Sequence, residues 1–219
     1  FEQRDIELTP LIVASAKKLK RVLADEQNEV LDALRRNDSV RAIDELLPSS
    51  GEHSARYHDA IADEFAAAAQ AGCASICDGG KAKLAKAKVT LATDAAAEVM
   101  REWLVMPLRE RLESCLSDGD GDTTEITKHA RAVYREWKTK RIDEQLDDVF
   151  LMAFGRGAFA AIDVGVPVVW TTDSSLPACA DCEDNTLAGA VPAGQDFPTG
   201  DAFAPAHIGC RCLLLRAGS

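Results

Sequence analysis

The sequence has few aromatic residues and lacks any long apolar run. Phe, Trp and Tyr make up only 5% of the 219 residues, whereas hydrophobic residues make up 47%, and alanine supplies much of that share. Alanine is the best helix former and its small side chain lets helices pack closely, so the composition favours a helical core over a sheet core. No apolar stretch approaches the ~20 residues that a membrane-spanning helix needs. We therefore expect no membrane partner.

A recognisable signal peptide is also missing. Because the chain begins at Phe1 rather than at methionine, we expect a processed product or part of a longer protein. The sequence contains seven cysteines, and an odd count without a secretion signal argues against a framework of disulfides. Such cysteines are typically metal ligands or free thiols in a reducing cytoplasm.

Positive charge is scarce as well. The chain has 25 Lys and Arg against 36 Asp and Glu, which gives a net charge of −11. An acidic protein is repelled by phosphate backbones, and this argues against general nucleic-acid binding. Two basic clusters, at residues 17–21 and 81–88, interrupt the acidic background. Clusters of this kind are usually solvated helix faces, but either could contact phosphate or an acidic partner.

Residues 9 to about 163 are expected to form one helix after another. Thr9 and Pro10 suit the N-cap and first position of a helix that ends near Asn37, since proline has no N–H to leave unsatisfied there. A short helix should start at Ser39 and stop at Pro48.

Three more helical stretches are predicted downstream. One covers about His53–Cys77 and ends at Gly79–Gly80, and another covers about Thr93–Leu116, where Pro107 should kink or break it near Met106. Asp122 then caps a long helix that weakens at two later glycines, Gly155 and Gly157. Its apolar residues recur at mostly helical spacing: Ile126, Ala130, Val133, Trp137, Ile142, Leu146, Val149, Phe150 and Phe154.

The composition changes after Gly165. Residues 166–170 are β-branched and strand-like, and five of the eight prolines lie between Pro167 and Pro205. We predict a mainly α protein, with several long helices followed by a small irregular β subdomain. Its expected parts are an N-terminal helical docking arm (1–50), a helical body (51–163) and a cysteine-rich C-terminal subdomain (164–219).

The cysteine-rich segment predicts a structural zinc site. Two ligand pairs separated by a few tens of residues are typical of such sites, and a subdomain with so few large apolar residues usually needs a metal to fold. Five residues compete for four positions. The first choice is Cys179, Cys182, His207 and Cys210, and in the second choice Cys212 replaces His207. The alternative is a set of reduced buried thiols, or disulfides that form after cell lysis.

The same segment carries a family resemblance. Its residues are Trp170-Thr-Thr-Asp173, Cys179-Ala-Asp-Cys182, Leu187-Ala-Gly189 and Pro205-Ala-His207-Ile-Gly-Cys210-Arg-Cys212. This pattern resembles the C-terminal signature of the tailed-phage head-morphogenesis family, the Mu F-like minor head proteins. Ile208 stands where the family usually has proline. The resemblance covers roughly the last fifty residues, with a weaker likeness in the long helix before them.

The resemblance implies a structural role in the virion. Members of this family are minor capsid components that associate with the portal vertex and act in head assembly or DNA delivery. The expected partners are therefore the phage portal protein, the major capsid or scaffold protein, and packaged DNA. The expected location is the capsid interior near the portal, in multiple copies, after assembly in the host cytoplasm.

Two other function classes remain open. A cytosolic zinc-ribbon adaptor would share the metal site but would not bind a portal. A zinc-dependent hydrolase would need an open coordination position and a nearby general base, for which Glu183 or Asp184 are the candidates. We favour the non-enzymatic interpretation and assign no catalytic or cofactor-binding residues, because four cysteines so close together suit a closed structural site.

Overall fold

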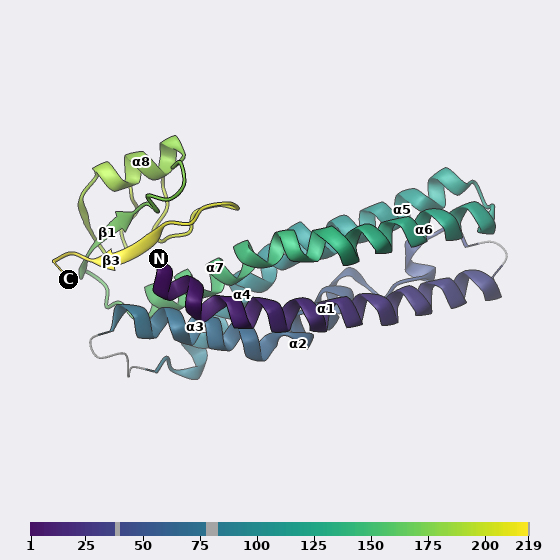
Figure 1. The fold of residues 1–219 in the computed structure, drawn as a ribbon, viewed down its shortest axis with the longest axis horizontal. Coiled ribbons are helices and arrows are strands. Elements are labelled where there is room, and N and C mark those ends of the chain that lie inside the picture. The colour runs from purple at the N-terminus through teal and green to yellow at the C-terminus, as the bar shows by residue number, and fades with distance from the viewer. Residues whose placement is uncertain (38–39, 78–82, 219) are drawn as a thin grey trace. The chain divides into compact units, whose positions relative to one another are not determined.

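The structure is a computed structural model that describes residues 1–37, 40–77 and 83–218 (Figure 1). Most of the chain is helical, and a small sheet lies near its C-terminus, so the predicted mainly α fold with a small C-terminal β part is confirmed. The helical elements are α1 (Glu2–Arg36), the 3-10 turn η1 (Ile43–Glu45), α2 (Ser50–Ala60), α3 (Ala62–Ile76), α4 (Lys86–Met100), the π-helical turn η3 (Arg101–Val105), α5 (Met106–Gly119), α6 (Thr123–Glu136), the π-helical turn η4 (Trp137–Arg141), α7 (Ile142–Ala160) and α8 (Ala180–Leu187). The strands are β1 (Pro167–Thr171), β2 (Ala190–Pro192) and β3 (Leu213–Arg216).

The chain forms two compact units whose segments alternate along the sequence. Unit 1 comprises residues 1–12, 63–96 and 148–219, and unit 2 comprises residues 13–62 and 97–147. Helices α1, α4 and α7 each contribute residues to both units. Within the described ranges, no helix combines the length and the apolar composition needed to cross a lipid bilayer.

Helix α1 begins earlier than the sequence pattern predicts. It starts at Glu2, so Thr9 is not an N-cap and Pro10 lies inside the helix. The Thr9 hydroxyl instead donates to the carbonyl oxygen of Asp5 at 2.6 Å. Leu8 and Arg4 are both buried, and this packing stabilises the turns that precede Pro10. The predicted apolar stripe is buried further along α1, at Leu19, Leu23, Val30 and Leu34.

The next two predicted helices need correction. Ser39, the predicted start of the short helix, and Gly79–Gly80, the predicted end of the next one, lie outside the described residues. Residues 40–49 contain only the η1 turn. The single helix expected over His53–Cys77 is two helices, because the chain turns at the buried residue Ile61. Helix α2 starts from Ser49, whose side chain and that of Glu52 form a capping box.

Pro107 interrupts the α-helical hydrogen bonding without ending the helical run. The run begins at Lys86 rather than near Thr93, passes through the π-helical turn η3, and returns to α geometry at Met106. A wider turn accommodates a residue that has no N–H and would otherwise clash with the preceding turn. A second π-helical turn, η4, lies opposite, where the indole N–H of Trp137 donates to the carbonyl oxygen of Leu104 at 3.0 Å.

The long helical run that starts after Asp122 agrees closely with the prediction. The Asp122 carboxylate accepts hydrogen bonds from the amides of Thr124 and Glu125, and α6, η4 and α7 follow without a break. All nine predicted core positions, from Ile126 to Phe154, are buried. The run continues through Gly155 and Gly157 to Ala160, so the weakening expected at these glycines does not end it.

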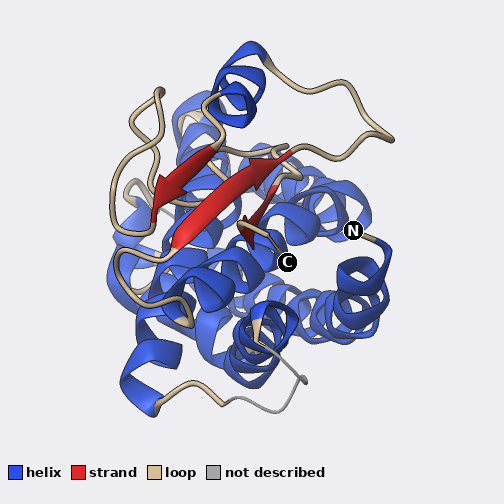
Figure 2. Cartoon of the chain, turned by 90° about the vertical axis from the view of Figure 1, so that its left-hand side faces the viewer, coloured by secondary structure: helices blue, strands red, loops and turns tan. Residues whose placement is uncertain are grey.

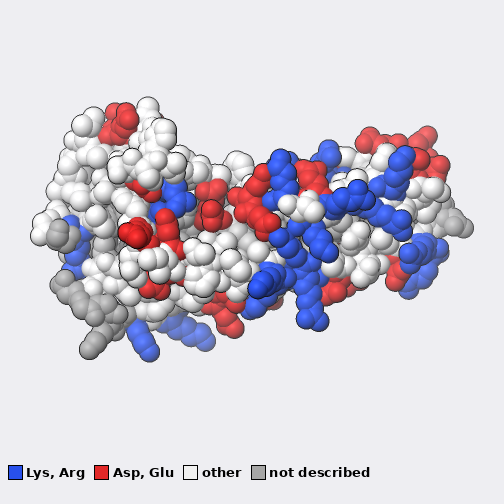
Figure 3. Space-filling model, in the orientation of Figure 1, with Lys and Arg blue, Asp and Glu red and all other residues white. Residues whose placement is uncertain are grey.

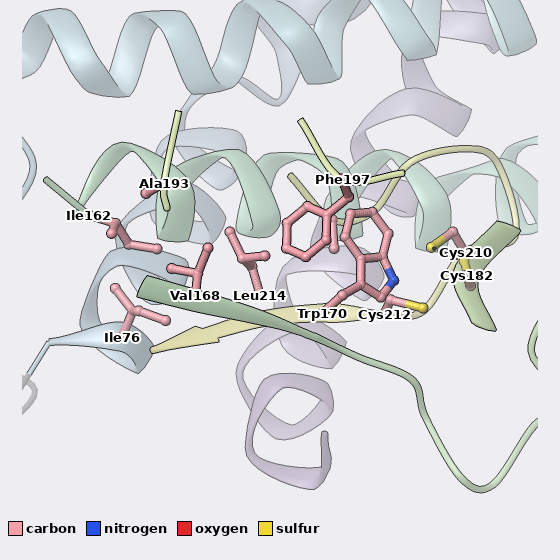
Figure 4. Packing of buried hydrophobic residues seen from close by; sticks show 11 residues of the cluster. Ile76, Ile162, Val168, Trp170, Cys182, Ala193, Phe197, Cys210, Cys212 and Leu214 are labelled. Carbon is pink, nitrogen blue, oxygen red and sulfur yellow. Dashed lines mark hydrogen bonds between the residues drawn. The ribbon is translucent and has the colours of Figure 1, made fainter. Parts of the chain in front are cut away.

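The three strands form an antiparallel sheet in the order β2-β1-β3 (Figure 2). Val168 and Trp170 point from the central strand into the core of unit 1 and are almost fully buried. The Trp170 ring packs edge-on against Phe197, with ring centroids 5.3 Å apart. Figure 4 shows three buried cysteines, Cys182, Cys210 and Cys212, at one end of this apolar cluster. The cysteine-rich loops are therefore continuous with the core that the sheet covers.

Candidate metal centre

The first ligand pair is placed by the N-terminus of α8. Cys179 occupies the N-cap position with extended backbone angles, and its sulfur accepts a hydrogen bond from the amide of Cys182 at 3.4 Å. A thiolate is stabilised at this position by the backbone amides and by the positive end of the helix dipole. Cys179 is exposed, whereas Cys182 is buried on the inner side of the helix. The CxxC motif thus presents one sulfur at the rim and one in the interior.

The second ligand group comes from the turn that precedes β3. The amide of Cys210 donates to the carbonyl oxygen of His207 at 3.1 Å, and Gly209 supplies the left-handed backbone conformation in this turn, with φ +81°. The Nδ1 atom of His207 lies 2.8 Å from the carbonyl oxygen of Ile208, which leaves Nε2 directed at the cysteines. A hydrogen bond from the far ring nitrogen to a carbonyl is the usual way of orienting a metal-binding histidine.

The five predicted ligands converge on Cys182. Its sulfur lies 3.6 Å from the sulfur of Cys210 and 3.8 Å from Nε2 of His207, and the latter is 3.2 Å from the sulfur of Cys179. Zinc–sulfur bonds of about 2.3 Å in a tetrahedron place two sulfurs about 3.8 Å apart. The separations around Cys182 are therefore close to those of ligands that share one ion.

The ligand atoms form two groups of three that share Cys182. The rim group contains Cys179, Cys182 and His207, and the inner group contains Cys182, Cys210 and Cys212. Within each group all ligand atoms lie within 4.8 Å of one another. Both of the four-residue sets expected from the sequence draw on this cluster. They differ in whether His207 at the rim or Cys212 in the interior completes the coordination.

The surroundings of the cysteines shift their pKa values in opposite directions. A hydrogen bond from the Cys212 thiol lowers the pKa of Cys210 to about 5, and the amide of Cys182 lowers the pKa of Cys179. Burial raises the pKa of Cys182 to about 12, and donation to Cys210 raises the pKa of Cys212. The hydrogen bond to the Ile208 carbonyl raises the pKa of His207. Cys210 in the second ligand segment therefore has the most acidic thiol of the cluster, and the thiolate is the form that binds a cation.

Residues outside the five ligands hold the ligand loops in place. The indole N–H of Trp170 is directed at the sulfur of Cys212, and the carboxylate of Asp148 in α7 accepts from the amide of Gly209 at 2.8 Å. The two ligand segments line a small cavity of about 120 Å³. Within the described part of the chain, neither ligand group includes a carboxylate. All the donors are sulfur or imidazole nitrogen, which suits a borderline-soft ion such as zinc.

Comparison with known proteins adds no relative. No protein-family model matches this chain, and no curated protein or solved structure matches it either. The description of the site therefore rests on its geometry alone. The two groups, Cys179–Cys182–His207 and Cys182–Cys210–Cys212, could hold a metal ion.

The residues that anchor the ligand loops from a distance are not apparent in the sequence pattern. Arg4, Asp5 and Asp148 contact the second ligand loop but lie about 60 or more positions away from it in sequence. The available signal at Arg4 was its spacing, because a charged residue four positions before Leu8 lies on the apolar stripe of α1. Periodicity alone does not show which face of a helix meets a loop so distant in the chain.

Proposed function

We propose that this protein is a structural, non-enzymatic component of a tailed-phage head that docks at the portal vertex. The supporting observation is the position of the residues that carry the resemblance to Mu F-like minor head proteins. Trp170 packs in the core of unit 1, and the cysteines and His207 of the same signature meet in one cluster. The signature residues thus make up the stabilising centre of the C-terminal subdomain.

The metal in this proposal is a structural zinc ion bound first by Cys179, Cys182, His207 and Cys210. Three of the distances among these atoms, from 3.2 to 3.8 Å, lie within about 0.4 Å of the edges of a zinc tetrahedron. Cys212 then remains as a buried neighbour of Cys182 and Cys210, and it is the substitute ligand if His207 is displaced. Four protein ligands fill a structural site and leave no open position for a substrate.

A basic surface on unit 2 is the proposed contact with the partner. Lys17 and Arg21 are exposed on α1, and Arg131, Arg135 and Lys138 are exposed on α6 and η4, spaced as one face of a helix. The two helices are neighbours, because Tyr134 of α6 bonds to Glu26 of α1. Figure 3 shows Lys and Arg side chains gathered over this part of the molecule. A basic face on a chain of net charge −11 favours a partner with an acidic surface, and we assign that partner as the portal protein.

Co-expression with the portal protein of the same phage tests this proposal. We expect the two proteins to elute together in size-exclusion chromatography at low salt, in multiple copies, and to dissociate as the salt concentration rises. Lys17→Glu combined with Arg21→Glu should weaken binding about tenfold. Arg35→Glu with Arg36→Glu makes the same charge change at the far end of α1 and should leave binding unchanged.

A second candidate function predicts the opposite result. A zinc-ribbon adaptor would contain the same metal site but would remain a stable monomer. If the protein stays monomeric and binds neither portal nor capsid at micromolar concentration, the phage proposal is wrong and the adaptor is favoured.

A further inference from the structure

Arg4 is a buried arginine in the first turns of α1, with only 3% of its surface exposed. Its Nε donates to the carboxylate of Asp5 at 2.8 Å, and its Nη1 donates to the main-chain carbonyl oxygen of Arg211 at 2.6 Å. Its Nη2 lies 3.8 Å from the carboxylate of Asp173. Burying a guanidinium is costly unless its donors are satisfied. The position of the Arg211 carbonyl therefore matters for the stability of this end of α1.

Arg211 lies between two of the candidate ligands, Cys210 and Cys212. Its Nη2 donates to both carboxylate oxygens of Asp5 at 3.0 Å, and its Nε lies 3.8 Å from the carboxylate of Asp173. Two arginines and two aspartates thus form a closed ionic network within unit 1. This network connects the first turns of α1 to the ligand loop.

The ligand loop is also held from its other side. The Asp148 carboxylate of α7 accepts from the amide of Gly209, which lies between His207 and Cys210. The segment 207–212 is therefore fixed at three places: by α7 near its start, by the ligands in the cluster, and by α1 at Arg211. If the ligands lose their common ion, the two helix contacts must hold the loop alone.

We propose that metal binding and the docking of residues 1–12 are coupled through Arg4, which acts as a positioning residue for the ligand loop. The bound metal holds Cys210, and with it the Arg211 carbonyl that Arg4 needs. Arg4 in turn holds the loop in the conformation that binds metal. Because coupling between two binding events is reciprocal, each must strengthen the other by the same factor.

This coupling gives the metal a second role beyond stapling the subdomain. The first turns of α1 precede Lys17 and Arg21 in the segment 1–50, which the sequence predicts to be a docking arm. Loss of metal would release these turns, so the metal state would control how the arm is presented. The inference rests on the proposed metal site, but it is tested separately from it.

The experiment uses the full chain and compares Arg4→Gln with Arg56→Gln. Arg56 is the matched control, because it binds the α1 residue Glu29 through two hydrogen bonds of 2.6 and 2.9 Å but lies in unit 2. Zinc affinity is measured by competition with a chromophoric chelator, and hydrogen exchange of residues 1–12 is followed with and without chelator.

We expect chelation to accelerate exchange in residues 1–12 of the wild-type protein and of Arg56→Gln. Arg4→Gln should bind zinc about tenfold more weakly, as is usual when a residue that supports metal ligands is lost. Its residues 1–12 should exchange rapidly even with zinc bound. If Arg4→Gln fails to fold, Arg4→Lys provides the same test, since lysine keeps the positive charge but lacks the guanidinium fork that reaches both Asp5 and the Arg211 carbonyl.

Two results overturn the coupling while leaving the metal proposal intact. One is zinc binding by Arg4→Gln, or by Arg4→Lys where that variant replaces it, at wild-type affinity. The other is exchange of residues 1–12 that does not respond to chelation. A wild-type protein that binds no zinc at all overturns both proposals.

Discussion

Cys182 is the residue on which the candidate metal centre depends most. It belongs to both ligand groups, it is only 3% exposed, and its sulfur is close to both Cys210 and His207. Removing this one sulfur breaks the rim group and the inner group together. The metal proposal can therefore be tested at one position without deciding between His207 and Cys212.

We predict that Cys182→Ser abolishes metal binding and loosens the C-terminal subdomain. The wild-type protein, purified without chelator, should carry about one zinc per chain, and the variant close to none. Since zinc at such sites contributes folding free energy directly, residues beyond about 165 should become sensitive to protease while the helical circular dichroism is largely retained. Elemental analysis and limited proteolysis measure both effects.

Cys115→Ser is the matched control for this variant. The Cys115 thiol is also buried but donates to the carbonyl oxygen of Arg111 at 3.1 Å, a bond that a serine hydroxyl can replace. Zinc content and protease resistance should match the wild type. Wild-type protein without zinc and with every thiol titratable in the native state would contradict the prediction, as would full protease resistance of Cys182→Ser.

Helices α3 and α7 approach each other closely at two glycines. A side chain at Gly157 would collide with the backbone of Ala69, and one at Gly72 would collide with the backbone of Phe154. Both helices lie here in unit 1, and Phe65 of α3 packs on Phe150 of α7 with ring centroids 5.3 Å apart. The glycines are required because backbone atoms, which cannot move aside, occupy the space a Cβ would need.

Gly157→Ala should lower the free energy of unfolding by about 1–3 kcal/mol, as overpacking usually does. This loss should outweigh the roughly 1 kcal/mol by which alanine favours a helix over glycine. Gly51→Ala is the control, since Gly51 lies in the first turn of α2 with nothing within 4 Å of the added methyl group. Denaturant titration should show this second variant unchanged or slightly more stable. Equal stability of the two variants would mean that α3 and α7 are not in contact at this point.

Both tyrosines of the chain lie in one buried polar cluster of unit 2. Tyr134 donates to Glu26 at 2.9 Å, and the second oxygen of Glu26 lies 2.8 Å from Nε2 of His53. Burial, and then the charge of Glu26, raise the pKa of Tyr134 and of Tyr57. The cluster joins α1, α2 and α6, so ionisation of either tyrosine opposes the folded state of the unit.

We predict that the protein loses stability as the pH rises above about 10. An unfolded tyrosine ionises near pH 10, whereas the folded pKa is higher. The stabilisation is therefore fully present below pH 10 and is lost at about 1.4 kcal/mol per pH unit for each tyrosine above it. Tyrosinate absorbance should rise together with the loss of helical signal. In Tyr134→Phe, stability should fall with pH above pH 10 by about 1.4 kcal/mol per pH unit less than in the wild type, because one tyrosine no longer contributes. Ionisation of both tyrosines in a fully folded protein would contradict this prediction.

The sequence by itself determined the helical class, the long run after Asp122 with its buried positions, and the five cysteine and histidine residues of the cluster. These features are local or repetitive: a cap, an apolar residue every three or four positions, and pairs of ligands at short spacing. Each of them follows from interactions within a few turns of chain, which a linear pattern records.

Only the tertiary structure decided where α1 begins, that position 157 has no room for a side chain, and how the ligand loop is anchored. Arg4 and Arg211 are separated by 207 positions along the chain, and Asp148 and Gly209 by 61. Helix α1 passes through Pro10 without stopping because buried side chains before it are held by distant segments. Such contacts depend on how segments far apart in the sequence pack together, and packing of this kind overrides local propensity.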